Sequence, residues 1–449
     1  MGRCRGISEP DVRGSSSPPE TSDIVDTLVD GRGVARALGK TVFVHGALKG
    51  ERVIFSRRKK RRNFDEAELI EILQPAPERV TPRCEAFGIC GGCSLQHLSP
   101  ADQLQLKQSV LVDNLQRIGS VEPGRLLEPI SESVWGYRRK ARLAVKYVTR
   151  KGRVLVGYRE RNKPYVADMN RCETLHPSVG EHLSDLVELI DGLSIREQLP
   201  QIEVAVGDNA VAMIFRVLSP PSQDDLTRFT DFQCSSGVQV YLQDKGPDSI
   251  TALPGQSAPE GLYYDLPKFG VSINFTPTDF IQVHADVNRQ MIEKAISLLN
   301  PSRDSRVLDL FCGLGNFSLP IATLAGEVVG IEFAMDMVER AGANAKSAGL
   351  SNVVFRQVDL STPSDAGARE WQGFDLVMLD PPRTGALEMM DILVQIDAER
   401  VLYVSCHPAT LARDANYLVH ELGYALTAAG VMDMFPHTSH VESMALFEK

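Results

Sequence analysis

The sequence predicts an α/β protein whose C-terminal part forms a doubly wound parallel sheet, and two observations support that fold class. Four apolar runs typical of buried strands follow one another at residues 305–310, 326–331, 352–358 and 374–379. Each run leads into glycines or acidic residues, as expected where the carboxyl ends of parallel strands border a ligand crevice. Ahead of this domain, shorter runs predict a small β-barrel and then a central α+β region.

The first two runs are followed by groups that are suited to hold a ligand. Gly313 and Gly315 allow a close approach of the backbone, and the helix expected from about Ser318 offers unpaired N–H groups. Glu332 lies about 20 residues further on, where such folds hold a ribose diol. The loop lacks the third glycine of dinucleotide sites, which disfavours a dinucleotide.

S-adenosylmethionine (SAM) is the ligand that these positions favour. Asp309 and the glycine loop would face its methionine part, Glu332 its ribose and Asp359 its adenine amine. Taken by itself, each acid is more simply interpreted as a solvated carboxylate on a loop. The prediction depends on their succession at the ends of neighbouring strands.

A single thiol, Cys406, follows the apolar run Leu402-Tyr403-Val404 in a turn that contains Pro408. A carboxylate and the glycine loop can converge on a thiol in this position, which is how an intracellular enzyme presents a nucleophile. The alternative is a buried structural cysteine, because free cysteine is usually an inert small hydrophobe.

A second group of cysteines lies upstream, with Cys84, Cys90 and Cys93 in a glycine-rich stretch and Cys172 further along. Closely spaced thiols on a loop that glycines allow to curl are typical of metal binding, and disulfides are rare in a reducing cytosol. Four thiolates suit either a zinc ion or a [4Fe-4S] cluster. Only one Cys-x-x-Cys pair is present, whereas zinc ribbons use two, so the spacing favours the cluster.

The chain resembles the RNA (uracil-5)-methyltransferases, specifically the iron-sulfur type that modifies 23S ribosomal RNA. The resemblance covers the chain from about Ser22 to its last residue and rests on motifs that occur in the expected order. These motifs are Asp279-Phe280-Ile281-Gln282-Val283, Asp309-Leu310-Phe311-Cys312-Gly313, Asp380-Pro381-Pro382-Arg383, Ser405-Cys406-His407-Pro408 and Asp433-Met434-Phe435-Pro436-His437-Thr438 with Glu442.

The resemblance implies a Rossmann-like, SAM-dependent methyltransferase domain at residues 271–449, with Cys406 as nucleophile and Glu442 as base. It implies that a [4Fe-4S] cluster is held by Cys84, Cys90, Cys93 and Cys172, and that SAM is held by Gln282, Phe311, Asn316, Glu332, Asp359 and Asp380. His407 departs from the family pattern, because asparagine is expected after the nucleophile. An imidazole there puts the pH dependence and the rate in question.

Methylation of uracil at C5 explains why these residue types are wanted. Uracil C5 is a poor nucleophile, and addition of the Cys406 thiolate to C6 turns the ring into an enolate that can attack an activated methyl group. The C5 proton must then leave, for which Glu442 is the candidate base. Methylation of an exocyclic amine needs no nucleophile and typically uses an aromatic residue after Asp-Pro-Pro, whereas this chain has Arg383. The target uracil would have to leave its stack.

The N-terminal part predicts RNA contact. We expect a disordered tail at residues 1–21, and a five-stranded barrel at 22–80 that looks like the OB-like TRAM module. The basic run Arg57–Arg62 would track phosphates, although a solvated hairpin edge gives the same pattern. A linker at 75–82 leads to a central domain at 81–270 that carries the cysteine loop, with an amphipathic helix at about 99–118.

Composition sets the remaining expectations. The net charge of −10 argues against RNA only if charge is evenly spread, and it is not. No signal peptide or spanning segment is visible, so we expect a cytoplasmic monomer with no membrane contact and no obligate protein partner. Of the eight cysteines, Cys4 falls in the tail, and Cys234 and Cys312 are read as ordinary apolar positions.

Alternative functions stay open. A transfer RNA could be the substrate instead, although the related transfer RNA enzymes generally lack the barrel and the cysteine loop. An RNA-binding adaptor with an inactive core should have lost the nucleophile or the base, and both Cys406 and Glu442 are present. A redox or radical iron-sulfur enzyme would need an open cluster position beside the cofactor loop, whereas this four-thiol set is closed and lies in another region.

Overall fold

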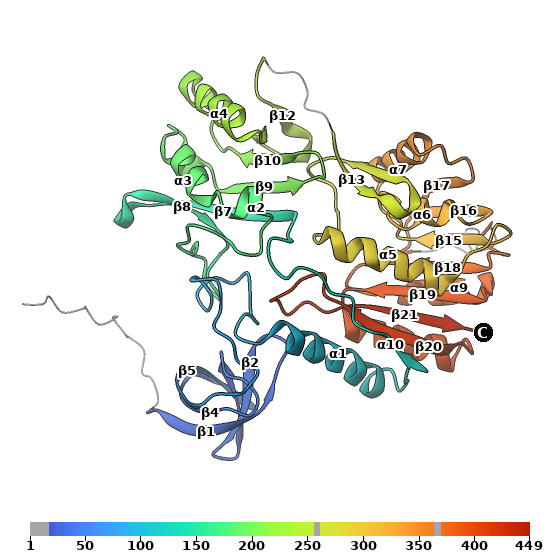
Figure 1. Ribbon diagram of the computed structural model, residues 1–449, viewed down its shortest axis with the longest axis horizontal. Coiled ribbons are helices and arrows are strands. Elements are labelled where there is room, and N and C mark those ends of the chain that lie inside the picture. The colour runs from blue at the N-terminus through green and yellow to red at the C-terminus, as the bar shows by residue number, and fades with distance from the viewer. Residues whose placement is uncertain (1–17, 256–260, 363–369) are drawn as a thin grey trace, which may run out of the picture. The chain divides into compact units, whose positions relative to one another are not determined.

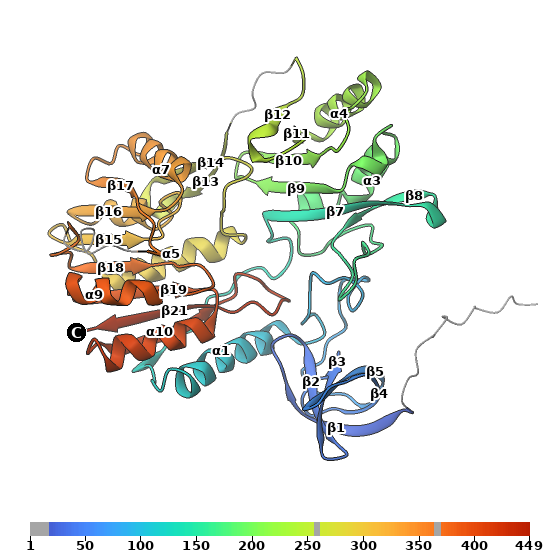
Figure 2. The same ribbon diagram turned by 180° about the vertical axis from the view of Figure 1, so that it is seen from behind.

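The computed structural model describes residues 18–255, 261–362 and 370–449, and Figure 1 and Figure 2 show it from opposite sides. The chain divides into two compact units. The first contains the residues up to Thr81 together with His97–Ser99, and the second contains Pro82–Gln96 and Pro100–Lys449.

The first unit is a closed five-stranded barrel with the strand order β1-β2-β3-β5-β4. Inward-facing side chains, among them Val42, Val44 and Phe55, alternate with exposed ones and fill the interior. The predicted small barrel is therefore confirmed. Its strands are β1 (Glu20–Thr27), β2 (Arg32–Ala37), β3 (Lys40–His45), β4 (Arg52–Lys60) and β5 (Phe64–Gln74).

Two predictions at the barrel need correction. The tail expected to reach Thr21 ends earlier, because β1 already begins at Glu20; residues 1–17 lie outside the described residues. The stretch at 75–82 is not a free linker, because Arg79 forms an ion pair with the buried Glu51 and donates to the Gly46 carbonyl at 2.6 Å.

The basic run is split by the fold. Arg57 is 7% exposed and donates to Asp65 at 2.6 Å and to both carboxylate oxygens of Glu20 at 2.7 Å. The prediction that the whole run tracks phosphates is therefore wrong for Arg57, whose charge is neutralised within the barrel. Residues 58–62 are exposed.

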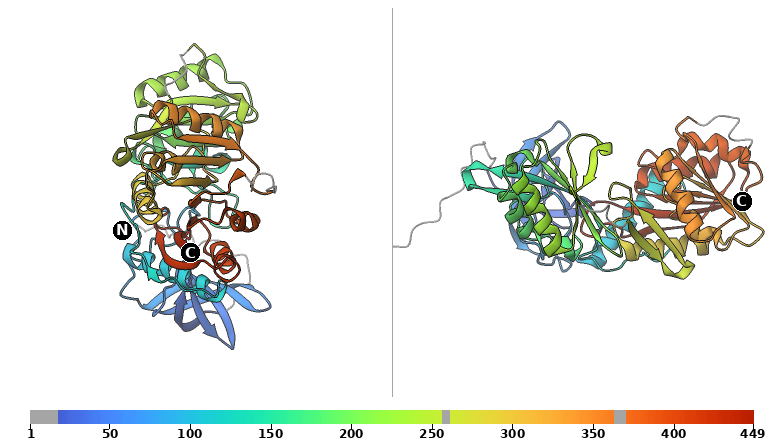
Figure 3. Two further views of the ribbon diagram at one scale, coloured as in Figure 1. Left: turned by 90° about the vertical axis from the view of Figure 1, so that its right-hand side faces the viewer. Right: turned by 90° about the horizontal axis from the view of Figure 1, so that it is seen from above.

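The central part of the second unit is a six-stranded sheet with the order β12-β11-β10-β9-β7-β8. Helices α3 (Leu183–Asp191) and α4 (Gln223–Ser236) pack on one face of it, which can be followed in Figure 3. Ser222 and Asp225 form a capping box at the start of α4. The strands are β7 (Lys140–Val148), β8 (Arg153–Gly157), β9 (Gln201–Val206), β10 (Val211–Arg216), β11 (Gln239–Gln243) and β12 (Ile250–Ala252), and a short helix, α2 (Pro177–Gly180), precedes α3.

The C-terminal part is an eight-stranded sheet with the order β17-β16-β15-β18-β19-β21-β20-β6. Strands β15 to β19 are parallel to one another, and β21 runs antiparallel to both β19 and β20. The doubly wound sheet predicted from the apolar runs is thus confirmed. Its strands are β6 (Arg125–Leu126), β15 (Arg306–Leu310), β16 (Glu327–Glu332), β17 (Val353–Gln357), β18 (Leu376–Leu379), β19 (Arg400–Ser405), β20 (Ala425–Met432) and β21 (Glu442–Glu448).

Helices cover both faces of this sheet. In Figure 1 α5 crosses in front of the strands, and in Figure 2 α9 and α10 lie in front of the opposite face. The hairpin β13 (Leu262–Leu266) and β14 (Val271–Phe275) adjoins α7. The helices are α5 (Ala285–Leu299), α6 (Ser318–Ala322), α7 (Met335–Ser347), α9 (Met390–Ile396) and α10 (Pro408–His420).

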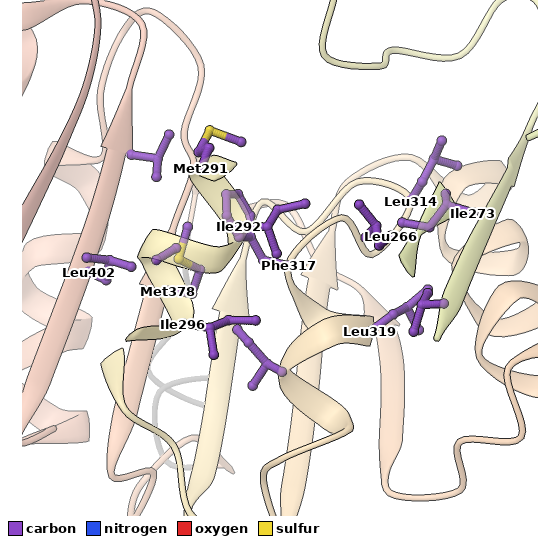
Figure 4. Close-up of a cluster of buried hydrophobic side chains, with 14 of the residues drawn as sticks. Leu266, Ile273, Met291, Ile292, Ile296, Leu314, Phe317, Leu319, Met378 and Leu402 are labelled. Carbon is purple, nitrogen blue, oxygen red and sulfur yellow. The ribbon is translucent and has the colours of Figure 1, made fainter. Parts of the chain in front are cut away.

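The main apolar core lies between α5 and the sheet. Met291, Ile292 and Ile296 of α5 are at most 7% exposed and belong to one cluster with Met378 of β18 and Leu402 of β19. Figure 4 shows these side chains together, with Phe317 beside them. Their spacing along α5 places them on one helical face. Burying this face anchors the helix that follows the segment containing Gln282.

Two elements that precede the central sheet in the chain attach to the C-terminal one. The predicted amphipathic helix is confirmed as α1 (Pro100–Arg117), which packs against α10 and β20. Strand β6 pairs with β20. The domain boundary expected near residue 270 stays a prediction. The C-terminal sheet also includes β6, which lies well before that boundary in the chain.

Candidate active site

A cavity of about 790 Å³ opens at the carboxyl ends of β15, β16, β18 and β19. It lies where a doubly wound sheet presents its crevice. The eight residues that the family resemblance implies for the cofactor or for catalysis all line it: Gln282, Phe311, Asn316, Glu332, Asp359, Asp380, Cys406 and Glu442.

The backbone register brings Cys406 and Glu442 together. Ser405, the last residue of β19, pairs with Ser443 in the antiparallel ladder with β21. The ladder ends at this pair, which Cys406 directly follows on one segment and Glu442, in β21, directly precedes on the other, so the register brings the two residues to the same end of the ladder. Both side chains line the cavity. A thiol and a carboxylate thus share one wall.

Burial raises the pKa values of the acidic groups on this wall and so favours their neutral forms. Burial raises the pKa of Glu442 to about 7, although the cations Arg383 and Lys107 act to lower it. Burial and then the charge of Glu442 raise the pKa of Asp380 to about 8. The pKa of the Cys406 thiol is also raised, first by burial and then by the two acids, with Arg383 opposing. Near neutral pH the free site therefore keeps Cys406 as a thiol and shares protons between the acids.

His440, for which no role was predicted, also lines the cavity. It contacts Arg383 through Nδ1, at 3.2 Å from Nη2, and stacks on Phe435 with ring centroids 4.7 Å apart. Burial and then the nearby cations Arg383, Arg138 and Lys107 lower the pKa of His440 to about 4. The imidazole is therefore neutral at physiological pH.

Aromatic side chains are the other lining groups that were missed. Tyr264, Phe280 and Phe435 line the cavity, and Phe280 is 69% exposed. They come from separate parts of the chain, so no local sequence pattern predicts that they line one cavity. A flat exposed ring at the mouth is suited to stack on a nucleobase.

The opposite end of the cavity is shaped by the glycine loop and Glu332. Gly313 and Gly315 have φ values of 55° and 87°, which only glycine adopts easily. One oxygen of the Glu332 carboxylate accepts from Gly313 N at 3.1 Å, and the other accepts from Phe333 N at 2.8 Å and Ala334 N at 3.0 Å. The carboxylate is held in one orientation and borders the cavity.

Asn316 is engaged by the protein. Its Oδ1 accepts from the Tyr264 hydroxyl at 2.8 Å and from Asn288 Nδ2 at 3.1 Å, and its Nδ2 donates to Asn288 Oδ1 at 2.9 Å. Asp309 does not reach the cavity at all. It is fully buried and accepts from Ser318 Oγ, so the expectation that it faces the methionine part is wrong.

His407 caps a helix and does not face the cavity. Its Nδ1 accepts from Thr410 N at 3.3 Å at the start of α10, and its side chain is exposed. A neutral imidazole accepts this hydrogen bond as the expected asparagine would. The structure therefore gives no support to a direct effect of His407 on the Cys406 thiolate.

The four predicted metal-binding cysteines, Cys84, Cys90, Cys93 and Cys172, line one small cavity elsewhere in the second unit. Burial raises the pKa of Cys90 to about 11 and that of Cys93 to about 12. In the described part of the chain, no set of three or more His, Cys, Asp or Glu side chains has the geometry of a metal site.

The other cysteines differ from expectation. Cys234 is exposed rather than apolar and buried, and Cys312 is buried but borders the active-site cavity. Cys4 lies outside the described residues. Among the helices that the structure describes, none combines the length and apolar character needed to cross a membrane.

Comparison with known proteins gives consistent matches. The model of the tRNA (uracil-5-)-methyltransferase family matches residues 270–449. A protein of Alkalilimnicola ehrlichii, named 23S rRNA (uracil(1939)-C(5))-methyltransferase RlmD, is 53% identical over 94% of this chain and 94% of its own length. A protein of the same name from Methylococcus capsulatus is 47% identical over 97% of this chain and 99% of its own.

A solved structure shows the same fold. The Pyrococcus abyssi tRNA (uracil-54, C5)-methyltransferase, in complex with S-adenosyl-L-homocysteine, superposes with a TM-score of 0.74 at 24% identity. The match covers 95% of this chain and 99% of that one.

Proposed function

The chain belongs to the 23S rRNA (uracil(1939)-C(5))-methyltransferase family, and we propose that it transfers a methyl group from SAM to C5 of that uridine in 23S ribosomal RNA. The observation that carries this proposal is the pairing of Ser405 with Ser443, which brings the adjoining residues Cys406 and Glu442 to one end of the ladder. Both face the cavity that the glycine loop also borders.

Each of the two residues has a distinct part in the reaction. The Cys406 thiol passes its proton to a carboxylate of the site and adds as a thiolate to uracil C6, and the ring becomes an enolate with a nucleophilic C5. Bound SAM supplies the electrophilic methyl group that C5 attacks. Glu442 then accepts the C5 proton as the Cys406 sulfur leaves C6, which restores the ring double bond. A base whose pKa is about 7 is well matched to this step at neutral pH.

The glycine-loop end of the cavity is the proposed SAM site. The oriented carboxylate of Glu332 would accept from the ribose hydroxyls, and Asp359 would accept from the adenine amine. Gln282, Phe311 and Asp380 border the same space. Asn316 would act by fixing the loop, because its amide is already bonded to Asn288 and Tyr264.

Cys84, Cys90, Cys93 and Cys172 are the proposed ligands of a [4Fe-4S] cluster. Four thiols around one cavity are the right donor set. Buried thiols become thiolates only beside a compensating cation. The cluster would hold the loop in shape, and a zinc ion on the same thiols is the alternative that metal analysis would reveal.

RNA recognition is assigned to the barrel, where residues 58–62 are exposed cations. Transfer RNA is the second candidate substrate, because the matching family model and the solved relative both carry that substrate in their names. We assign the barrel at residues 22–80, the central domain at 81–270 and the methyltransferase domain at 271–449, acting as a monomer.

The deciding experiment maps 5-methyluridine by mass spectrometry in 23S ribosomal RNA and transfer RNA from cells with and without the gene. Loss at uridine 1939 of 23S RNA, restored by the wild type and not by Cys406→Ala, is the expected result. Loss only in transfer RNA would favour the second substrate, and no change in either would exclude the enzyme reading.

A further inference from the structure

Nine residues without regular structure, 433–441, connect β20 to β21 and deliver Glu442 to the cavity. This segment, called the return loop below, also carries His440. Its placement therefore sets three cavity-lining groups at once, Phe435, His440 and Glu442. Two side chains that hold it come from α1, which precedes it by more than three hundred residues.

Lys107 of α1 holds the beginning of the return loop. Lys107 and Asp433 are each 1% exposed and form an ion pair with Nζ and Oδ1 2.7 Å apart. The same ammonium group donates to the Phe435 carbonyl at 3.0 Å. Removing one partner of a buried ion pair leaves the other charge buried and uncompensated, which costs several kcal/mol of stability. The Lys107–Asp433 contact therefore holds the loop firmly in place.

Gln103 holds the middle of the loop. Its Oε1 accepts from His437 N at 2.9 Å, and its Nε2 lies 3.1 Å from His437 Nδ1 and donates to the Leu95 carbonyl at 3.0 Å. Gln103 and Lys107 are four residues apart and thus share one face of α1.

The cysteine loop completes the hold on His437. The His437 carbonyl accepts from Ser94 N at 2.8 Å and from Leu95 N at 3.0 Å, directly after Cys93. Trp135 stacks on the imidazole with centroids 4.0 Å apart. His437 has φ of 66°, a backbone conformation that a non-glycine residue keeps only when its surroundings impose it.

We propose that Lys107 and Gln103 are positioning residues for methyl transfer, which hold the return loop so that Glu442 faces Cys406. This rests on the proposed function and deepens it. Neither residue lines the active-site cavity, so neither can touch the substrate uracil there. They act through the loop, and Lys107 acts also through its charge.

The charge of Lys107 gives the inference a distinctive signature. The groups around Glu442 are Asp380 after β18, Cys406 after β19, Arg383 after Asp-Pro-Pro and His440 in the loop, with Lys107 from α1. Burial raises the pKa of Glu442, and Arg383 and Lys107 oppose it. Removing the Lys107 charge must therefore raise that pKa further, and the acidic limb of the pH–rate profile must move to higher pH.

The test compares Lys107→Met, the double variant K107M/D433M and Gln103→Ala in the full-length protein with a 23S RNA fragment. The double variant leaves no unpaired buried charge and so keeps the test valid if K107M fails to fold. Arg117→Met is the matched control, because it removes one cation from the same helix at a side chain that is 80% exposed.

We expect kcat to fall on the order of 10²-fold in the anchor variants, as for a catalytic group displaced by about 1 Å. Because C5 deprotonation becomes slow, a covalent protein–RNA adduct should accumulate on ordinary uridine. Folded anchor variants that keep wild-type kcat would overturn the inference. So would a loss of kcat with neither adduct nor pH shift, which indicates general damage. Failure of the proposed function is distinct, since the wild type itself would not methylate the RNA.

Discussion

Ser405 and Ser443 pair at the end of the ladder between β19 and β21, and the Ser443 hydroxyl donates to the Ser405 carbonyl at 3.3 Å. Cys406 directly follows Ser405, and Glu442 directly precedes Ser443. Strand register therefore brings the two residues to one end of the ladder, and register shifts only by whole residues and reverses the faces when it does. A covalent step and a proton transfer on adjacent ring carbons need such a fixed relation.

Cys406→Ala should abolish methyl transfer while RNA binding is retained. The alanine removes the sulfur that adds to uracil C6 and leaves the barrel untouched. RNA affinity and methyl transfer are measured on the same fragment. Cys234→Ser is the control, because Cys234 is exposed on α4, and it should keep full activity. RNA carrying 5-fluorouridine should trap the wild type through Cys406, since no C5 proton is present to be removed. Turnover on normal RNA without such trapping would rule out the covalent step.

Glu442→Gln should stop the reaction after methyl transfer. Without the carboxylate the C5 proton stays, and methylated RNA remains bound to Cys406, visible as a band that survives denaturing gels. For the wild type, Glu442 must be ionised to act, and burial raises its pKa to about 7. The rate should therefore fall below about pH 7, by roughly tenfold per pH unit. A rate that stays flat down to pH 5 would exclude Glu442 as the base.

The sequence predicted much of the catalytic sheet and most groups at its crevice, because strands and the residues after them are local signals. Glu332 and Asp380 could be found in this way. Asp309 was misplaced because it is inside a strand, where alternation turns its side chain toward Ser318. The strand ends could be predicted from the sequence, whereas the direction of the Asp309 side chain within its strand could not.

Groups that depend on distant contacts could not be predicted. His440 belongs to the return loop, which contacts Lys107 and Gln103 of α1, and nothing near either residue in the sequence indicates that contact. Arg57 looked like its basic neighbours, and only the closed barrel shows that it faces Asp65. Charge runs are local, but the partners of a charge are not.

Glu332→Ala should weaken SAM binding by about 10- to 100-fold, the range expected for lost hydrogen bonds to a charged group. The substitution removes the carboxylate and also frees the N–H groups of Gly313, Phe333 and Ala334. Titration calorimetry with SAM measures the change. Glu339→Gln, an exposed position on α7, is the control and should bind SAM as the wild type does. Unchanged affinity in Glu332→Ala would remove the ribose assignment.

Arg57→Met should destabilise the barrel by about 3 kcal/mol, because it leaves Asp65 buried without that partner. Burial alone would raise the pKa of Asp65, but hydrogen bonds from Lys40 and Arg57 outweigh it and lower the pKa to about 2. This stabilisation is present above about pH 4 and is lost as pH falls toward 2. Denaturant unfolding at pH 7 and at acidic pH measures both effects, and an equal loss at all pH values would contradict the assignment.

Exposed neighbours of Arg57 should behave differently. Replacing Arg58, Lys59 and Lys60 with glutamine should leave stability within about 0.5 kcal/mol, as is usual for surface positions. If these cations contact phosphates, RNA affinity should fall and the slope of log affinity against log salt should flatten by roughly 0.7 to 0.9 per lost contact. Binding measured from 50 to 200 mM salt tests this. An unchanged slope would indicate that the basic run does not contact phosphates and is instead a solvated strand edge.

Removing the metal from the cysteine loop should impair catalysis through His437, because Ser94 and Leu95 hold its carbonyl directly after Cys93. Anaerobically purified protein should contain about four iron and four sulfide per chain, and Cys93→Ala should lose them. The variant should also show a lower Tm, and kcat should fall more than SAM affinity, since the glycine loop lies on other strands. Arg150→Met is the control, because Arg150 is exposed and does not line the cysteine cavity. Zinc in place of iron would change the metal but keep the proposed dependence of His437 on the metal-bound cysteine loop. Metal-free wild-type protein with full activity would contradict that dependence.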